Sequence, residues 1–262
     1  MKLESLRDRL VNKFINFKYF LRFKRKSEPS TSNMKLVFED KFSTFDKKRW
    51  RVSQPWGNFH PDSLYDYYGE NSVSVDDKLI LQQKYSPKEF ELNGEKITIP
   101  YSVGLITSLD AYGYGFYEFD IQLPKGIGLW PAVWLTSFDS WPPEIDILEA
   151  YSDENCNYGK RLQSNLHFDY TPNNKDIGGM DHIIKNPLDK LKVSCWWTKD
   201  FIKIYYNGYL VRKTTSEDIL KWFRDKKMII ILNNGMRSEY IPMIDNSITT
   251  EFFIYSVKYC SE

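Results

Sequence analysis

The chain has 262 residues, of which 42% are apolar, enough for one large domain with a packed core. The 36 basic and 35 acidic side chains leave a net charge of +1, which argues against a nucleic-acid-binding surface as the main purpose. Aromatic residues make up 16% of the chain, an excess that either an aromatic-rich core or an aromatic binding surface would explain.

The first 26 residues carry a helical pattern. Apolar side chains recur at a spacing of three and four at Leu3, Leu6, Leu10, Phe14, Phe17 and Leu21, and much of the remainder is basic. This predicts a basic amphipathic helix that could bind a membrane surface, a partner protein or the chain's own domain. Lys18 and Arg22 interrupt the densest apolar part and no small-residue cleavage site follows, so we expect neither a secretory signal nor a transmembrane segment. The cellular location stays open.

Residues 27–33, SEPSTSN, contain turn formers and no apolar side chain, which predicts a linker. We therefore expect two parts: a helix and linker over residues 1–33, and a folded domain over residues 34–262.

Short apolar and aromatic runs broken by Gly, Pro, Asn and Asp fill the rest of the chain and predict strands. The expected strands are 35–39, 79–81, 104–108, 115–123, 131–135, 164–168, 191–197, 201–206, 228–232 and 252–259. Asn207-Gly208 between two runs predicts a type I′ hairpin. One helix is expected over 217–223, with Thr214 and Glu217 as a capping box. Many strands and almost no helix predict an all-β fold, a β-sandwich or jelly roll.

The most unusual stretch is EIDILE at 144–149, because three carboxylates lie within what reads as a buried strand. Side chains of a strand alternate between its faces, so Glu144 and Asp146 share one face while Glu149 would fall on the other. A β-bulge after Asp146 would return Glu149 to the face of the other acids, and such bulges are common beside active sites. We therefore predict the bulge; the alternative is a surface strand whose acids face water.

Two further runs precede the acids: YGFYEFDIQLPKG at 114–126 and GLWPAVWL at 128–135. In their order and spacing these runs and the acidic stretch resemble the family 16 glycoside hydrolases, the laminarinase, agarase and carrageenase group. Weaker similarity extends from about Phe38 to Tyr259. The resemblance implies a jelly roll with a concave substrate cleft. It also implies an endo-acting, retaining β-glycosidase that hydrolyses a polysaccharide: a β-1,3- or β-1,3/1,4-glucan or a galactan.

By this resemblance Glu144 is the nucleophile and Glu149 the acid/base, about 5 Å apart as in other retaining glycosidases. Asp146 lies between them, and its charge would help keep Glu149 protonated. His167, in the run NLHF, matches a His on a neighbouring strand of the family and could hydrogen-bond Asp146 or the substrate.

Aromatic residues near the acids are the expected sugar-binding surfaces. By resemblance at least two of Trp130, Trp134 and Trp141 line the subsites. The alternative is core packing, and among the three it is strongest for Trp130. Trp56 and Asn58 are expected to contact the substrate on its non-reducing side.

Several positions depart from the family pattern. Many laminarinases carry an acid shortly after the position of Asn58. This chain has Phe59 there instead, which argues against a laminarin preference. Ile254 replaces an Asp found in many members, which weakens the case for a structural calcium; with no metal-ligand motif elsewhere, no metal or cofactor is expected. Other usual polar or glycine positions are occupied by Leu105, Asp120, Pro143 and Leu191.

The remaining candidates are expected to be structural. Cys156, Cys195 and Cys260 are expected to be reduced and mostly buried. His60 and His182 match no motif and are expected in loops. Two other functions stay open: a transglycosylase of the same fold, and a carbohydrate-binding or structural protein without activity.

Overall fold

The computed structural model describes residues 26–60, 63–155, 158, 162–169, 180–182 and 186–262. The predicted N-terminal helix, except for Lys26, and Cys156 lie outside the described residues. Within them, no helix is both long and apolar enough to span a membrane.

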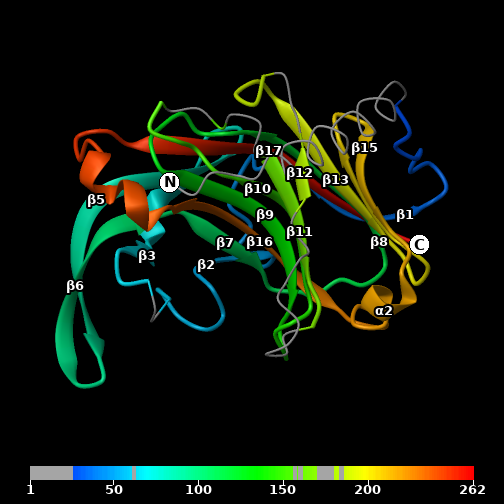
Figure 1. Ribbon diagram of the computed structural model, residues 1–262, viewed down its shortest axis with the longest axis horizontal. Coiled ribbons are helices and arrows are strands. Elements are labelled where there is room, and N and C mark those ends of the chain that lie inside the picture. Colours follow the sequence, from blue (N-terminus) through cyan, green and yellow to red (C-terminus); the bar gives the residue numbers. More distant parts are fainter. Residues whose placement is uncertain (1–25, 61–62, 156–157, 159–161, 170–179, 183–185) are drawn as a thin grey trace, which may run out of the picture.

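Two β-sheets pack against each other (Figure 1). The ten-stranded sheet has the order β15 (Tyr209–Thr214), β14 (Ile202–Tyr206), β13 (Leu191–Trp197), β8 (Gly115–Gln122), β17 (Thr250–Ser261), β5 (Leu79–Leu92), β6 (Glu95–Val103) and β3 (Asp66–Tyr68), with β1 (Lys35–Asp40) on β17 and β4 (Val73–Val75) on β5. The seven-stranded sheet has the order β12 (Met180–His182), β11 (Leu162–His167), β10 (Glu144–Ala150), β9 (Leu129–Ser137), β16 (Met228–Met236), β7 (Leu105–Ser108) and β2 (Trp50–Val52). The sandwich confirms the predicted all-β fold.

The core lies between the two sheets and follows strand alternation. In β8, Tyr117, Phe119 and Ile121 point into the core and are fully buried, while Glu118 and Asp120 between them are only partly buried. Each fully buried apolar side chain contributes roughly 1.5–3 kcal/mol, so this alternation fixes which face of each strand meets the core.

The hairpin predicted at Asn207-Gly208 is confirmed. These residues join β14 to β15 with φ values of 50° and 83°, the left-handed conformations that a type I′ turn requires. The helix prediction was too long and its cap was wrong: α2 covers only Glu217–Leu220 and follows Ser216. Thr214 instead belongs to β15, where it pairs with Ile202, and this pairing holds it away from the helix terminus.

A long hairpin was missed by the sequence analysis. β5 continues to Leu92, far beyond the expected 79–81, and β6 returns from Glu95 to complete the hairpin. Asn93 and Gly94 form the turn with φ values of 54° and 84°, so the Asn-Gly signal was present in the sequence. The hairpin projects beyond the sandwich (Figure 1).

The predicted linker is bonded to the ten-stranded sheet. Ser27 N donates to Gly208 O at 2.9 Å, the Ser194 hydroxyl donates to Glu28, and Lys258 Nζ donates to Thr31 Oγ1 at 3.1 Å. Cys195 and Cys260 are free and buried, as expected.

Candidate active site

The predicted β-bulge is present in β10 and sets the direction of its acids. Against β9, Glu144 pairs with Thr136 and Glu149 pairs with Ala132, with the register shift after Asp146. Five steps along β10, from Glu144 to Glu149, therefore correspond to four steps along β9, from Thr136 to Ala132. Because four is even, both glutamates lie on the same face of the sheet.

The bulge also keeps two consecutive apolar residues of β10 in the core. Ile147 and Leu148 are consecutive, yet both are fully buried among the core residues between the sheets. Without the extra residue one of them would exchange faces with Glu149, placing a carboxyl in the core and a leucine in the site. Hydrophobic burial therefore stabilises the arrangement that brings the three acids together.

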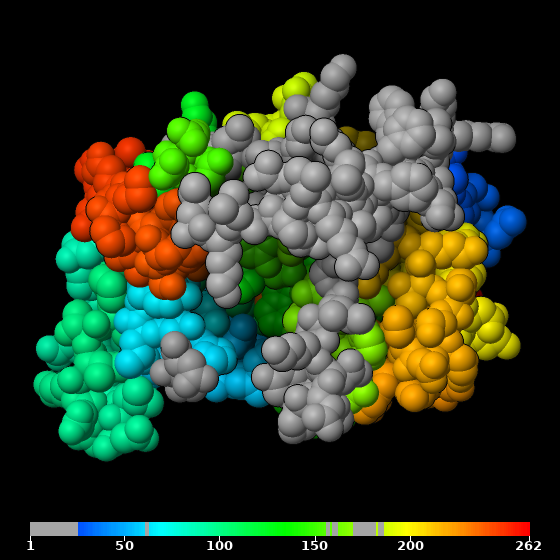
Figure 2. All heavy atoms as spheres, viewed as in Figure 1, coloured from blue at the N-terminus to red at the C-terminus, as the bar shows by residue number. Residues whose placement is uncertain are grey.

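The three acids line a cleft of about 340 Å³. Its lining residues come from both sheets and the loop before β3: Gln54, His60, Ser63, Tyr65, Asp66, Tyr68, Leu105, Trp130, Ala132, Trp134, Glu144, Asp146, Glu149, Asn233, Gly235 and Met236. The face of the molecule shown in Figure 2 is hollowed near its centre, where green atoms lie deeper than the neighbouring cyan ones. The lining includes four carboxyls and two amides, together with two tyrosines and two tryptophans.

The two carboxylate oxygens of Glu149 have different surroundings. Oε1 accepts hydrogen bonds from the Tyr151 hydroxyl at 2.8 Å and from Trp130 Nε1 at 3.1 Å. Oε2 is buried and has no hydrogen-bond partner within the described residues. Burial raises the pKa of Glu149, against the smaller lowering effects of Tyr151, Trp130, His167 and Asn165. Because both donors occupy Oε1, a proton carried by this carboxyl belongs on Oε2.

Glu144 lies in a different setting. Burial raises the pKa of Glu144 well above its usual value, and the charge of Asp146 raises it further. His167 opposes this shift electrostatically, and Trp141 Nε1 opposes it by donating to Glu144 Oε2 at 3.2 Å. Asp146 was expected to keep Glu149 protonated, but the largest cause of the raised Glu149 pKa is burial.

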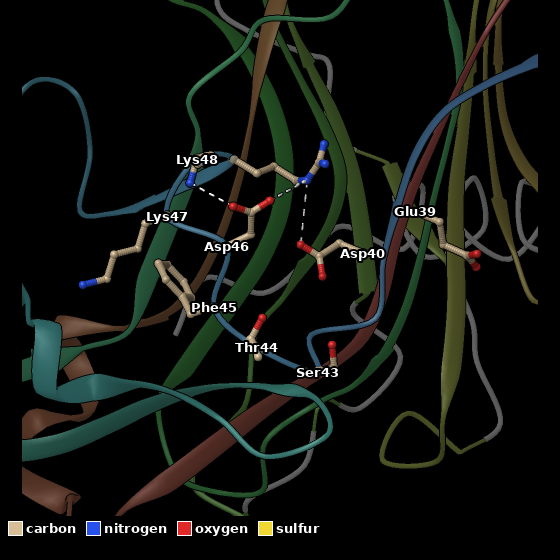
Figure 3. Close-up of a pocket in the computed structure, with 9 residues that line it drawn as sticks. Glu39, Asp40, Ser43, Thr44, Phe45, Asp46, Lys47 and Lys48 are labelled. Carbon is tan, nitrogen blue, oxygen red and sulfur yellow. Dashed lines mark hydrogen bonds and ion pairs between the residues drawn. The ribbon is translucent and has the colours of Figure 1, made fainter.

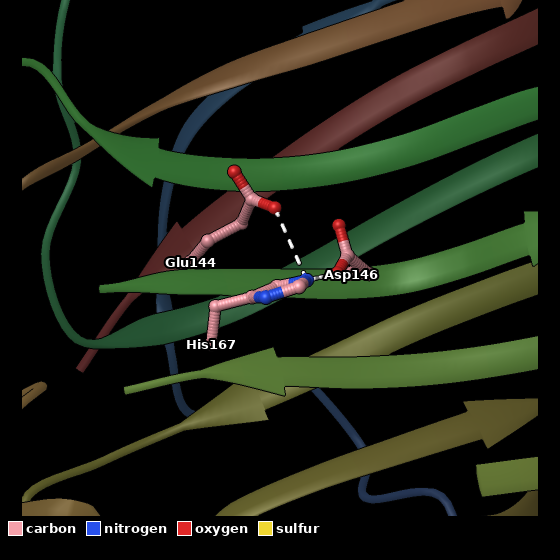
Figure 4. A group of neighbouring side chains, drawn as sticks. All are labelled: Glu144, Asp146 and His167. Carbon is pink, nitrogen blue, oxygen red and sulfur yellow. Dashed lines mark ion pairs between the residues drawn. The ribbon is translucent and has the colours of Figure 1, made fainter. Parts of the chain in front are cut away.

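His167 joins two of the acids (Figure 4). Its Nε2 lies 3.1 Å from Asp146 Oδ2 and 3.5 Å from Glu144 Oε1. The two strands enforce this contact, since His167 on β11 pairs directly with Glu144 on β10. One ligand atom from each of these three residues lies within 4.8 Å of the others, so they are the group best placed to hold a cation among the described residues.

The tryptophans that precede the acids all reach this site. Trp130, expected to line a subsite with core packing as the alternative, is 37% exposed and donates a hydrogen bond to Glu149. Trp134 lines the cleft with Nε1 donating to Asn233 Oδ1 at 2.8 Å. Trp141 is 50% exposed, with its ring 5.6 Å from that of His167. Indole faces beside carboxyls suit the flat apolar faces of sugar rings.

Trp56 and Asn58 are not among the residues that line the cleft. Both are exposed on the loop before β3, and Asn58 Oδ1 accepts a hydrogen bond from the Ser53 hydroxyl at 2.8 Å. His60 lies on the same loop, as expected, and lines the cleft. His182 was expected in a loop but lies buried in β12, where the Ser164 hydroxyl is 2.8 Å from its Nε2. Burial lowers the pKa of His182 to about 3, so it is neutral.

Several cleft residues were missed by sequence reasoning. They include Tyr65 and Asp66, before and on β3, and Asn233 and Met236 on β16. Tyr151, which donates a hydrogen bond to Glu149, was missed as well. Alternation on β3 was a usable signal for Asp66 and Tyr68 once that strand was placed. No local signal marks Asn233, because its position depends on the pairing of β16 with β9.

A second hollow, of about 490 Å³, lies along residues 39–49 (Figure 3). The acids Asp40 and Asp46 in this hollow bond to residues that are close to them in the sequence. Asp40 accepts from Trp50 Nε1 at 2.8 Å, Asp46 accepts from Lys48 N at 2.9 Å, and Arg49 lies within 4 Å of both carboxylates. The cleft that contains Glu144 is therefore the better candidate for chemistry.

Comparison with known proteins gives a consistent assignment. A model of the family described as "Glycosyl hydrolases family 16" matches residues 63–239. Glucan endo-1,3-beta-glucosidase A1 of Niallia circulans is 27% identical over 222 residues, which is 75% of this chain and 31% of that protein. Endo-1,3-1,4-beta-glycanase ExsH of Rhizobium meliloti (strain 1021) is 33% identical over 156 residues, 51% of this chain and 33% of that protein. Keratan-sulfate endo-1,4-beta-galactosidase of Sphingobacterium multivorum is 23% identical over 237 residues, 83% of this chain and 53% of that protein.

The chain therefore spans about a third to a half of the length of these relatives. Among solved structures, the laminarinase from Flavobacterium sp. UMI-01 has a TM-score of 0.70 at 22% identity, covering 87% of this chain and 100% of that one. SCLam, a non-specific endo-beta-1,3(4)-glucanase, has a TM-score of 0.73 at 22% identity, covering 90% and 93%. These two likenesses show that the fold is shared.

Proposed function

The chain belongs to glycosyl hydrolase family 16, and from that premise we propose that it is an endo-acting retaining β-glycosidase that hydrolyses a polysaccharide. The observation that carries the proposal is the placement of Glu144 and Glu149 on one face of β10, each with its own tryptophan donor. Two carboxyls with different surroundings, held beside one cleft, are what double displacement at an anomeric carbon needs.

In the first step the Glu144 carboxylate attacks the anomeric carbon while Glu149 transfers its proton to the departing glycosidic oxygen. The bond to the leaving sugar breaks as the bond to Glu144 forms. Glu149 suits the acid role because burial raises its pKa and its buried Oε2 has no hydrogen-bond partner among the described residues. In the second step Glu149 takes a proton from water, whose oxygen displaces Glu144 from the sugar.

Glu144 must be ionised to attack, although burial and Asp146 favour its protonated form. Trp141 counters this by donating a hydrogen bond to the carboxylate, and His167 counters it by facing the carboxylate. Asp146 in turn holds His167 at 3.1 Å, so its main role is to orient the imidazole that supports the nucleophile. These three residues position and tune Glu144.

The substrate we propose is a β-1,3- or β-1,3/1,4-glucan or a galactan. Relatives named for 1,3-beta-glucan, 1,3-1,4-beta-glycan and galactan substrates support this range. Many laminarinases carry an acid shortly after the position of Asn58. This chain has Phe59 there, and its ring packs 5.0 Å from that of Phe90 in the β5–β6 hairpin. That replacement of a polar contact by packing argues against equating the substrate with laminarin.

The test is a screen of purified enzyme against β-glucans and galactans, read out by new reducing ends and followed by NMR of the first product. We expect internal cleavage and a β-anomer formed first. An α-anomer first would exclude retention, and products longer than the starting chain would identify a transglycosylase. No cleavage of any polysaccharide by folded protein would favour the carbohydrate-binding or structural alternative.

A further inference from the structure

Asp66 is a buried acid that the mechanism does not use. It opens β3, is only 9% exposed and lines the cleft. Burial is the largest influence on the pKa of its carboxyl, and the hydrogen bond that opposes it comes from its own backbone N–H. An acid in this state is poised for a partner that enters from the cleft.

Strand geometry directs Asp66 toward the cleft. Alternation along β3 puts Asp66 and Tyr68 on one face, and both line the cleft. Tyr67 points the other way, where its ring lies 5.2 Å from that of Phe90 and its hydroxyl donates to Ser86 O at 2.9 Å. The β5–β6 hairpin therefore fixes Tyr67, and with it the direction of Asp66.

The position of Asp66 is distant from the reacting groups. Tyr68 packs against the cluster formed by Leu105 of β7 with Ile229 and Ile231 of β16, whereas the three acids lie on β10. Asp66 itself belongs to the ten-stranded sheet. In the seven-stranded sheet, the order β10, β9, β16, β7 places three inter-strand spacings, roughly 14 Å at about 4.8 Å per spacing, between the strand of the acids and β7. A sugar at Asp66 is thus more than one unit from the bond being cleaved, on the far side of Trp134.

The cleft surroundings restrict what Asp66 can bind. The described lining residues include four acids, Asp66, Glu144, Asp146 and Glu149, and neither lysine nor arginine. A sulfate or carboxylate on the sugar would meet like charge without a cation to pair with. A sugar hydroxyl fits, because it can accept from a protonated carboxyl or donate to an ionised one.

We propose that Asp66 is the specificity-determining residue of a distal subsite, where it hydrogen-bonds hydroxyls of an uncharged sugar and excludes sulfated or uronic sugars. This inference rests on the proposed glycosidase function and identifies its substrate class as a glycan uncharged at that subsite. Burial raises the pKa of Asp66 to about 7, so the subsite changes its hydrogen-bonding role near neutral pH.

The test uses full-length enzyme and oligosaccharides of increasing length from whichever polysaccharide it cleaves. We expect Asp66→Ala to lower kcat/KM on long oligosaccharides about tenfold or more, as for loss of one hydrogen bond to a charged group, and to leave the shortest cleaved substrate unchanged. Asp66→Asn should raise activity on chemically sulfated oligosaccharides relative to neutral ones. Asp110→Asn, which changes an exposed acid outside the cleft lining, is the matched control.

Two results would overturn the proposal. One is an equal loss of kcat/KM in Asp66→Ala on oligosaccharides of every length. The other is a ratio of activity on neutral to sulfated oligosaccharides that Asp66→Asn leaves unchanged. If Asp66→Ala fails to fold, the nearly isosteric Asn variant still provides the sulfation test. The pH dependence of KM for long substrates gives a separate readout, since its change near pH 7 should disappear in Asp66→Asn. Wild-type enzyme that cleaves no glycan would refute the proposed function instead, so the two failures are distinguishable.

Discussion

Glu144 and Glu149 lie on the same face of β10 although an odd number of positions separates them. Their partners on β9, Thr136 and Ala132, are four positions apart, and the bulge absorbs the difference. Each carboxyl also receives an indole N–H, from Trp141 at 3.2 Å and from Trp130 at 3.1 Å. The two acids are therefore alike in direction but differ in their other neighbours, which allows one to act as nucleophile and the other as acid.

Replacement of the proposed nucleophile should remove turnover. Glu144→Gln keeps the size of the side chain and the Trp141 contact, but an amide cannot form the glycosyl-enzyme. We expect hydrolysis to be abolished with an unchanged circular dichroism spectrum and thermal midpoint. Wild-type turnover by the purified variant would contradict the assignment of Glu144.

Loss of the proposed acid/base should depend on the leaving group. We expect Glu149→Ala to lose about 10²–10⁴ in rate on natural glycans, the range for general acid–base catalysis. Substrates with a good leaving group need no proton and should retain faster glycosylation, and added azide should restore turnover in place of activated water. Equal losses on both substrates without azide rescue would show that Glu149 has another role.

The acid limb of the pH–rate profile should move in opposite directions in two variants. Asp146 raises the pKa of Glu144, so Asp146→Asn should lower that pKa and shift the acid limb of kcat/KM to lower pH. His167 lowers the same pKa, so His167→Ala should shift the limb to higher pH. Residual activity measured across pH on an activated substrate checks both signs. Shifts in the same direction would exclude Glu144 as the titrating group.

Asp66 should make the protein less stable as the pH rises. Its pKa is raised from 3.8 to about 7, so the folded chain binds more protons than the unfolded chain between these values, and stability falls across that window. The contribution is about 4 kcal/mol at most. Thermal unfolding of Asp66→Asn and wild type from pH 4 to pH 8 should show the variant gaining in relative stability with pH. Parallel curves would argue against a raised pKa.

The N-terminal segment should be separable from the catalytic domain. We propose that residues 1–25 attach the protein to a membrane surface or a partner, and that their deletion leaves activity on soluble oligosaccharides unchanged. Deletion of residues 1–33 also removes the bonds of Ser27, Glu28 and Thr31 to the sheet, each with a net value of about 0.5–1.5 kcal/mol. We therefore expect a lower thermal midpoint only for the longer deletion. Loss of activity in the shorter one would indicate that the segment supports the fold.

The sequence by itself determined the fold class and the face of the acids. Alternating apolar runs predict strands because one face of each must be buried, and the bulge in β10 follows from the need to keep both Ile147 and Leu148 in the core. The Asn-Gly turn between β14 and β15 is equally local, since left-handed φ angles are set by residue type.

Only the tertiary structure decided which distant residues complete the cleft. Asn233 reaches Trp134 through the pairing of β16 with β9, and Asp66 enters from the end of the other sheet. The helix over 217–223 was cut short and Thr214 was drawn into β15 by its partner strand, so tertiary pairing overrode a local signal. Long-range strand pairing has no short sequence signature, because its free energy comes from side chains and backbone groups that meet only after folding.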